Sequence, residues 1–239
     1  MRRRIALLVA AALVLAACGY SSSGGSVSSR PPVGTDEVVV RVVTSGGFAA
    51  ESRQPAQLPQ LSVFGDGRLI VYGPTTLQFP GPALPNLQEV RVTGAGLRRI
   101  VDEARAAGLL DDPPPDYGEP GVTDQATTTV TVRAGSTTRQ VEVYALGFKG
   151  RVSGVTPEHS ENRRRLQQFI QLAGDPGALD EEVVRDSERR YEPAALAVLV
   201  RPSDSTEGDT RAWPLGDLAA TDCTVYTDGD LGTVLDAAR

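Results

Sequence analysis

The stretch from Thr127 to Leu146 reads Thr-Thr-Thr-Val-Thr-Val-Arg-Ala-Gly-Ser-Thr-Thr-Arg-Gln-Val-Glu-Val-Tyr-Ala-Leu. Two runs rich in β-branched residues flank Ala134-Gly135-Ser136, a pattern that predicts an antiparallel hairpin. Side chains alternate between the faces of a strand, so the valines of each run share one face: Val130 and Val132, then Val141 and Val143. The hairpin favours a fold built on antiparallel sheet.

Earlier runs of the same kind extend this sheet. They predict strands at 38–43, 61–64, 68–72 and 89–92, with Gly65-Asp66-Gly67 as a tight turn between the second and third. Thr93 is expected to cap a helix that ends at Gly108, and its apolar stripe is Leu97, Ile100, Val101 and Ala104. Thr156-Pro157-Glu158 opens a second helix, whose stripe is Leu166, Phe169, Ile170 and Ala173.

The C-terminal third is read in the same way. Residues 177–192 are polar and are expected to connect, whereas 194–200 form an apolar run that predicts a buried strand. Trp213 is expected to re-enter the core, and a third helix begins near Asp228. These patterns predict an α+β fold, with antiparallel sheets of hairpins packed by two or three helices; a degenerate β-helix repeat is the alternative.

Residues 89–105 and 223–239 align as a weak repeat of strand, threonine and helix, with five identities in seventeen positions. The first copy continues into the hairpin of 127–146, and the second is followed by no such strands in this sequence. We therefore expect 193–239 to be a second, incomplete α+β unit whose last helix has a partly uncovered apolar face. The alternative is a complete domain, in which that helix docks beside 194–200 and Cys223 is a small buried residue.

The N-terminal residues indicate export. Three arginines precede the apolar run Ile5 to Ala17, which at about 1.5 Å per residue is too short to cross a bilayer core of about 30 Å. Leu15-Ala16-Ala17-Cys18 resembles the lipobox of bacterial lipoproteins. That resemblance implies cleavage between Ala17 and Cys18 and lipidation of the Cys18 thiol.

The expected organisation follows from these features: a lipoprotein signal peptide at 1–17, a flexible tether at 18–37, an α+β unit at 38–150, a helix with its connector at 151–192, and the incomplete unit at 193–239. The net charge is −6, and loss of three arginines with the signal peptide would make it −9. Such an acidic chain argues against nucleic-acid binding.

Catalytic chemistry finds little support, and no catalytic residue or cofactor is predicted. His159 is the only histidine, at the start of a helix, and it belongs to no zinc or nucleophile-elbow motif. A thiol pair of Cys223 with His159 is disfavoured, because an acidic neighbour and an apolar strand do not activate a thiol. Gly94-Ala95-Gly96 lacks the lysine and the glycine spacing of phosphate-binding loops.

Acidic residues crowd the loop 111–124, where Asp112, Asp116 and Asp124 are weak candidates for a calcium site. The loop lacks the Asp-x-Asp-x-Asp-Gly spacing, so solvated turn residues are the preferred interpretation and no metal is predicted. Asp124 is expected to accept a hydrogen bond from a backbone N–H two residues on and so to fix the turn into the strand at 127.

Five short motifs are spread along the chain. They are the lipobox, Val63-Phe64-Gly65-Asp66-Gly67, the helix end Ala106-Ala107-Gly108-Leu109, Val122-Thr123-Asp124 and Trp213-Pro214-Leu215. Together they resemble, over most of residues 15–239, actinobacterial envelope lipoproteins with no assigned activity. The resemblance implies a further strand pair and a closing cysteine after the last helix. Since this sequence has neither, Cys223 would be half of a disulfide.

The expected function is that of a lipid-anchored lipoprotein on the extracytoplasmic face of the cell membrane, most simply a binding or scaffolding module. Its partners would be the membrane, through the anchor, and an envelope protein or small ligand. A secreted hydrolase and a calcium-dependent adhesion or sensing module are the alternatives.

Overall fold

Seven antiparallel strands form the main sheet, in the order β6-β5-β1-β2-β3-β4-β7. Their bounds are Val38–Gly46 (β1), Leu61–Phe64 (β2), Arg68–Tyr72 (β3), Leu87–Val92 (β4), Ala126–Ala134 (β5), Thr137–Tyr144 (β6) and Val184–Arg190 (β7). A separate two-stranded sheet pairs β8 (Ala195–Leu199) with β9 (Cys223–Thr227). The helices are α1 (Gly94–Ala106), α2 (Pro157–Gly174) and α3 (Asp228–Ala237), and a short 3-10 turn, Pro176–Ala178, follows α2.

The computed structural model describes residues 34–48, 57–77, 82–150, 153–178, 184–200, 212–217 and 223–238. The predicted signal peptide, its cleavage site at Ala17, Cys18 and most of the predicted tether lie outside these ranges. Within them, the predicted α+β class with antiparallel sheets is confirmed. The β-helix alternative is not what these residues form, because every strand pairing among them is antiparallel.

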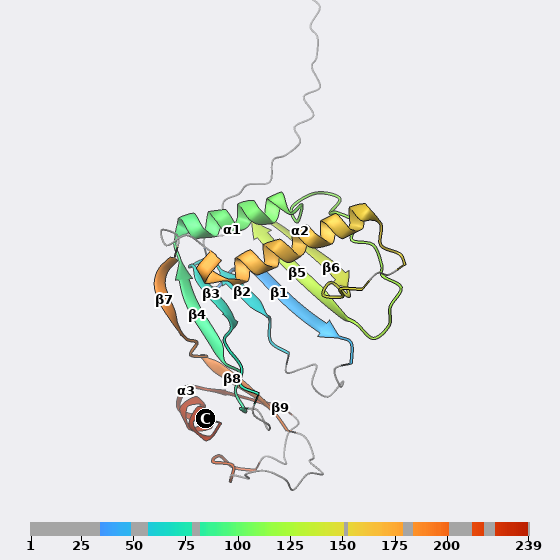
Figure 1. Ribbon diagram of the computed structural model, residues 1–239. Helices are drawn as coiled ribbons and strands as arrows, with labels where there is room; N and C mark the ends of the chain where they lie inside the picture. The colour runs from blue at the N-terminus through green and yellow to red at the C-terminus, as the bar shows by residue number, and fades with distance from the viewer. Residues whose placement is uncertain are drawn as a thin grey trace, which may run out of the picture.

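Both long helices lie on one face of the main sheet (Figure 1). α1 carries the chain from β4 across to β5, and α2 carries it from β6 back to β7. The core lies between these two layers. It includes Val42 and Val63 from the sheet, Ile100 from α1 and Leu166 from α2, each at most 1 % exposed.

Alternation within the strands explains why only one face is covered. In β1, Val40 and Val42 are fully buried, whereas Arg41 between them is exposed. Arg41 stands opposite Thr131 on β5 and Ser62 on β2, so a polar row crosses the centre of the uncovered face. A polar face of this kind gains little from burial, and the helices accordingly gather on the valine face.

The predicted boundaries of α1 are confirmed by its caps. The Thr93 side chain accepts a hydrogen bond from the Gly96 backbone N–H at 3.2 Å. At the other end, Gly108 has φ of +79°, a conformation that suits glycine, and Leu109 just beyond it is 1 % exposed.

The start of α2 is more tightly fixed than the sequence predicts. Thr156 accepts a hydrogen bond from the His159 backbone N–H at 3.1 Å, as expected of a capping threonine. In return, the Thr156 backbone N–H donates to His159 Nδ1 at 3.2 Å. His159 therefore closes a capping box, a role usually filled by Glu or Gln, and is not simply a solvated residue.

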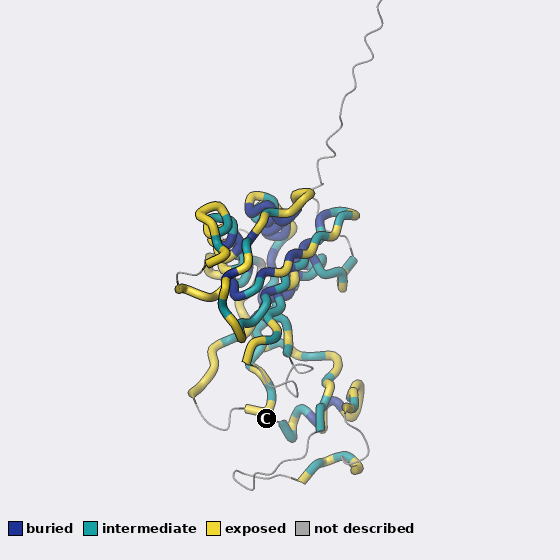
Figure 2. The backbone as a smooth tube through the Cα atoms, turned by 90° about the vertical axis from the view of Figure 1, so that its right-hand side faces the viewer, coloured by how far each residue is buried: buried dark blue, intermediate teal, exposed yellow. Residues whose placement is uncertain are grey.

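Two expectations for the C-terminal third are wrong. Within the predicted connector, residues 184–190 form β7, which pairs with β4 at the edge of the main sheet. The run at 194–200 forms β8 but is not buried. Each of its residues is exposed or partly exposed, since β9 is the one strand with which β8 pairs among the described residues. Figure 2 shows the buried residues concentrated where the helices meet the main sheet.

The β8–β9 sheet has its own small packing layer. Leu231 and Val234 of α3 are buried, and the Trp213 ring lies 5.8 Å from that of Tyr226, so Trp213 contacts this sheet and is absent from the main core. β9 and α3 repeat the strand-and-helix order of β4 and α1. Unlike Thr93, however, Thr227 makes no side-chain cap to its helix.

Candidate binding groove

Two of the three candidate calcium ligands, Asp112 and Asp116, have basic side chains as partners. The Asp112 carboxylate accepts a hydrogen bond from Arg139 at 2.7 Å, and that of Asp116 lies 3.3 Å from His159 Nε2. Across the part of the chain that the structure describes, no three His, Cys, Asp or Glu side chains come together in a way that could hold a metal ion. The acidic loop thus contributes ion pairs to its neighbours.

Asp124 holds the turn into β5 through its backbone. Its φ is +58°, a region that Asp tolerates better than most residues. The expected side-chain hydrogen bond to a nearby N–H is absent from the described residues. Instead Tyr144 Oη accepts from the Gln125 N–H at 3.1 Å and donates to the Val122 carbonyl at 3.0 Å. The phenol of Tyr144 therefore ties this turn to β6.

The structure separates the two residues considered for thiol chemistry. Cys223 opens β9, and His159 lies in the first turn of α2, elements that Figure 1 shows in different parts of the molecule. Cys223 is a free, exposed thiol.

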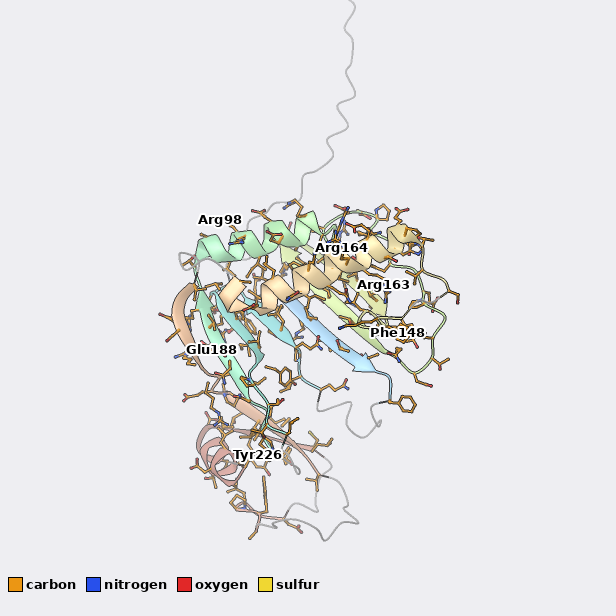
Figure 3. The ribbon with its side chains drawn as sticks, viewed as in Figure 1. Arg98, Phe148, Arg163, Arg164, Glu188 and Tyr226 are labelled. Carbon is orange, nitrogen blue, oxygen red and sulfur yellow. The ribbon has the colours of Figure 1, made fainter. Side chains whose placement is uncertain are left out.

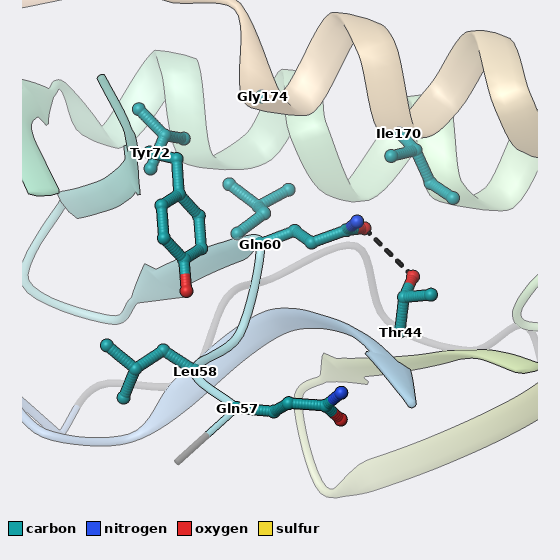
Figure 4. Close-up of a pocket in the computed structure, with 9 residues that line it drawn as sticks. Thr44, Gln57, Leu58, Gln60, Tyr72, Ile170 and Gly174 are labelled. Carbon is teal, nitrogen blue, oxygen red and sulfur yellow. Dashed lines mark hydrogen bonds between the residues drawn. The ribbon is translucent and has the colours of Figure 1, made fainter. Parts of the chain in front are cut away.

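A groove opens beneath the C-terminal half of α2, where it crosses the ends of the strands. One part has a volume of about 590 Å³ and extends over β2 and β3; the other, about 490 Å³, extends over β5 and the segment after β6. Thr44, Gln60 and Ile170 line both parts, so they form one continuous depression. We call it the α2 groove; Figure 4 shows its first part.

The polar groups of the α2 groove are all uncharged. They are the hydroxyls of Thr44, Thr128 and Tyr72 and the amides of Gln57, Gln60, Gln125, Gln167 and Gln171. Several of them are already oriented: Thr44 Oγ1 donates to Gln60 Oε1 at 3.1 Å and lies 3.2 Å from Thr128 Oγ1. In a chain whose residues are 23 % charged, such a neutral lining is a distinctive property of this surface.

Apolar side chains complete the lining at the β3 end. Leu58 is 41 % exposed and Tyr72 is 42 % exposed, and both are large apolar groups open to solvent. Burial raises the pKa of the Tyr72 phenol, and a backbone hydrogen bond from Leu58 opposes that shift. Tyr72 therefore stays protonated at neutral pH and presents a neutral hydroxyl beside its ring.

The main chain explains how these residues meet. Thr44 lies near the end of β1, Tyr72 ends β3, and Thr128 lies near the start of β5. Because neighbouring strands are antiparallel, these three positions lie at the same end of the sheet, where the strands begin or stop. The C-terminal half of α2 then supplies Gln167, Ile170 and Gln171 from above.

Beside the groove, Arg163 of α2 braces two loops. It is 8 % exposed and donates to the backbone carbonyls of Tyr117 at 3.2 Å, Tyr144 at 2.9 Å and Ala145 at 2.5 Å. One turn further along α2, Gln167 Nε2 donates to the Leu146 carbonyl at 2.6 Å. These bonds fix the segment after β6, which forms one wall of the groove.

Sequence reasoning identified none of the groove residues as functional. They belong to six separate segments, and threonines and glutamines of this kind also occur on any solvated surface. For Arg163 a signal did exist, because it lies three positions before Leu166 on the stripe that faces the core.

Searches against protein-family models, curated protein sequences and solved structures found no match to this chain. In the segments that the structure describes, no helix combines the length and the apolar character needed to span a bilayer.

Proposed function

We propose that this chain is a membrane-anchored envelope lipoprotein that acts as a binding module, with its ligand seat in the α2 groove. The anchor rests on the lipobox at Leu15–Cys18. The observation that carries the binding role is the groove itself, a depression at one end of the sheet that is lined by neutral hydrogen-bonding groups and one exposed aromatic ring.

The groove chemistry suits an uncharged, hydroxyl-rich ligand, and we propose a neutral glycan. Amides and hydroxyls both donate and accept hydrogen bonds, as sugar hydroxyls do. An aromatic side chain provides an apolar surface next to a polar tip, which suits the mixed faces of a sugar ring. A charged ligand would find no opposite charge among the lining residues.

The position of the groove is consistent with an anchored receptor. The predicted tether enters the domain at the N-terminal end of β1, whereas Thr44 of the groove lies six residues along that strand. At about 3.3 Å per residue, the groove stands about 20 Å further from the point of attachment. A ligand in the space beyond the membrane would therefore approach its open side.

Membrane fractionation tests the anchor. Replacement Cys18→Ala removes the acceptor thiol, so the variant should leave the membrane fraction or accumulate as an uncleaved precursor, because a diacylglyceryl anchor is needed to hold a soluble domain on a bilayer. A Cys18→Ala chain that is processed and fractionates with the membrane like the parent would contradict the proposal.

Saturation-transfer NMR tests the binding role. The full chain, held in a detergent without sugar head groups, is titrated with maltotriose and chitotriose. At least one should bind, and Tyr72→Ala and Gln60→Leu should each weaken it by roughly tenfold, or about 1.4 kcal/mol. The matched control is Gln140→Leu on β6, outside the groove. No saturation transfer to either sugar, or equal loss in the control, would exclude the glycan seat.

A further inference from the structure

Arg163 is a buried cation without a described anionic partner. Its three acceptors among the described residues are backbone carbonyls, and none of the ion pairs there includes it. Its neighbour Arg164, in contrast, is paired with Glu161. Figure 3 labels both arginines on α2. Burial is also the sole cause that lowers the pKa of Arg163, which means that no nearby carboxylate opposes the shift.

A guanidinium has five N–H groups, and the three carbonyls accept three of them. The Nε–H and one Nη1–H therefore have no acceptor among the described residues. A buried charge is costly unless it is paired and hydrogen-bonded, and carbonyl dipoles supply only part of the compensation that an anion would give.

A small cavity of about 160 Å³ adjoins this guanidinium. Besides Arg163, its lining includes Phe148, Gly150, Val155 and Ser160, and it shares Gln167 with the α2 groove. None of its lining residues is acidic. Since one water takes about 30 Å³ of liquid volume, the cavity has room for an anion of four or five heavy atoms.

We propose that this cavity binds a small oxyanion, a carboxylate or a phosphate-class group, whose charge pairs with Arg163. The planar guanidinium suits both anions, because it presents its donors in a fork that matches two oxygens. Ser160 also lines the cavity and lies three residues before Arg163 on α2. The cavity adjoins the α2 groove, but the proposal does not rest on the neutral ligand seat, because Arg163 does not line that groove.

Thermal unfolding of the full chain tests the site at pH 7 and constant ionic strength, in sodium acetate, sodium phosphate or sodium chloride. A ligand that binds only the folded state raises the melting temperature with its concentration. We expect a rise of several degrees in acetate or phosphate over chloride. A larger rise in acetate assigns the site to carboxylates, and a larger rise in phosphate assigns it to phosphate-class groups.

Two variants show whether the effect arises at this cavity. Ser160→Glu places a carboxylate of the chain beside Arg163, so it should raise the melting temperature in chloride and abolish the response to acetate and phosphate. Gln168→Glu adds the same charge to α2 beside Arg164 and should keep the response. Equal melting temperatures in all three salts, or a full anion response in Ser160→Glu, would overturn the proposal.

Discussion

Glu89 of β4 and Arg189 of β7 stand directly opposite each other, and Arg189 donates to the Glu89 carboxylate at 2.7 Å. The Glu89 side chain is 6 % exposed, whereas that of Arg189 is 63 % exposed. Glu89 also lies 3.6 Å from Arg91 on its own strand. This ion pair gives the polar edge strand β7 a specific side-chain contact with the sheet, beside its backbone pairing and the packing of Val184 against the core.

Glu89→Gln should loosen β7 from the sheet. The change removes a buried charge that accepts a hydrogen bond from one arginine and lies near another, so we expect a loss of about 1–2 kcal/mol in the free energy of unfolding. Hydrogen exchange should rise in β7 well before it rises in β1. Glu142→Gln, on the opposite edge strand, is the control. If the amides of β7 exchange equally in the variant and the parent, the ion pair does not hold the strand.

Tyr117→Phe should leave stability unchanged or increase it by up to about 1 kcal/mol, because the buried Tyr117 hydroxyl has no hydrogen-bond partner among the described residues. Tyr144→Phe is the matched contrast. Its hydroxyl makes two hydrogen bonds, so its loss should cost about 1–2 kcal/mol in urea unfolding. Equal costs for the two variants would contradict this assignment.

Tyr117 also makes stability depend on alkaline pH. Burial, with the nearby Asp111 charge, raises the pKa of Tyr117 to about 12, from an ordinary value of 10.0. The neutral phenol is thus favoured in the folded state, and its contribution to stability, complete below pH 10, is lost as pH rises toward 12. Urea unfolding from pH 9 to 12 should show a shallower decline in Tyr117→Phe than in the parent. Parallel curves would argue against a buried Tyr117.

Glu161 should make the stability of the fold depend on pH in the acidic range. Hydrogen bonds from Arg164 and Arg165 lower the pKa of its carboxyl to about 2, from 4.5. The lowered pKa belongs to the folded state. The contribution of Glu161 to the free energy of unfolding is therefore present above pH 4.5 and is lost as pH falls toward 2. NMR titration of the Glu161 carboxyl carbon should give a midpoint near 2 that rises in high salt, which screens exposed pairs. A midpoint near 4.5 in low salt would show that the pairs do not form.

Asp124 offers a test of backbone conformation against side-chain bonding. Because its φ is +58° and its side chain makes no hydrogen bond to the described residues, Asp124→Ala should cost about 1 kcal/mol, whereas Asp124→Gly should cost little or nothing. Chemical denaturation of the two variants provides the comparison. A glycine variant as unstable as the alanine variant would point to a side-chain contact after all.

The sequence predicts the elements whose burial pattern matches their geometry. β5 and β6 alternate regularly, and the stripe of α1 repeats at helical spacing, so both are found where expected. β7 could not be found in this way, because Val184 is its only apolar residue and an exposed edge strand needs no alternation. For β8 the error is the reverse, since its apolar run indicates a burial that a two-stranded sheet does not supply.

The groove could not be predicted from the sequence for a different reason, and the place of Arg163 on the core-facing stripe of α2 indicates its burial but not the cavity beside it. Both arise where the crossing of α2 brings together strand ends that are far apart in the chain. Arg163 also departs from the rule that charged residues lie outside, and carbonyls of Tyr117, Tyr144 and Ala145, which are far from one another or from α2 in the sequence, accept three of its five N–H groups. No local pattern records that convergence.

The central place of β1 has a consequence for folding. The meander of β1 to β4 is local in sequence, but the other edge of β1 pairs with β5, and Thr44 meets its partner Thr128 from 84 residues away. Until β5 arrives, a valine-rich strand has an unpaired edge of the kind that recruits other chains into aggregates. Long-range pairing of this sort is also slow. The arrival of β5 is therefore the step at which a newly made chain is most exposed to aggregation, and a chaperone that shields 38–46 would protect it there.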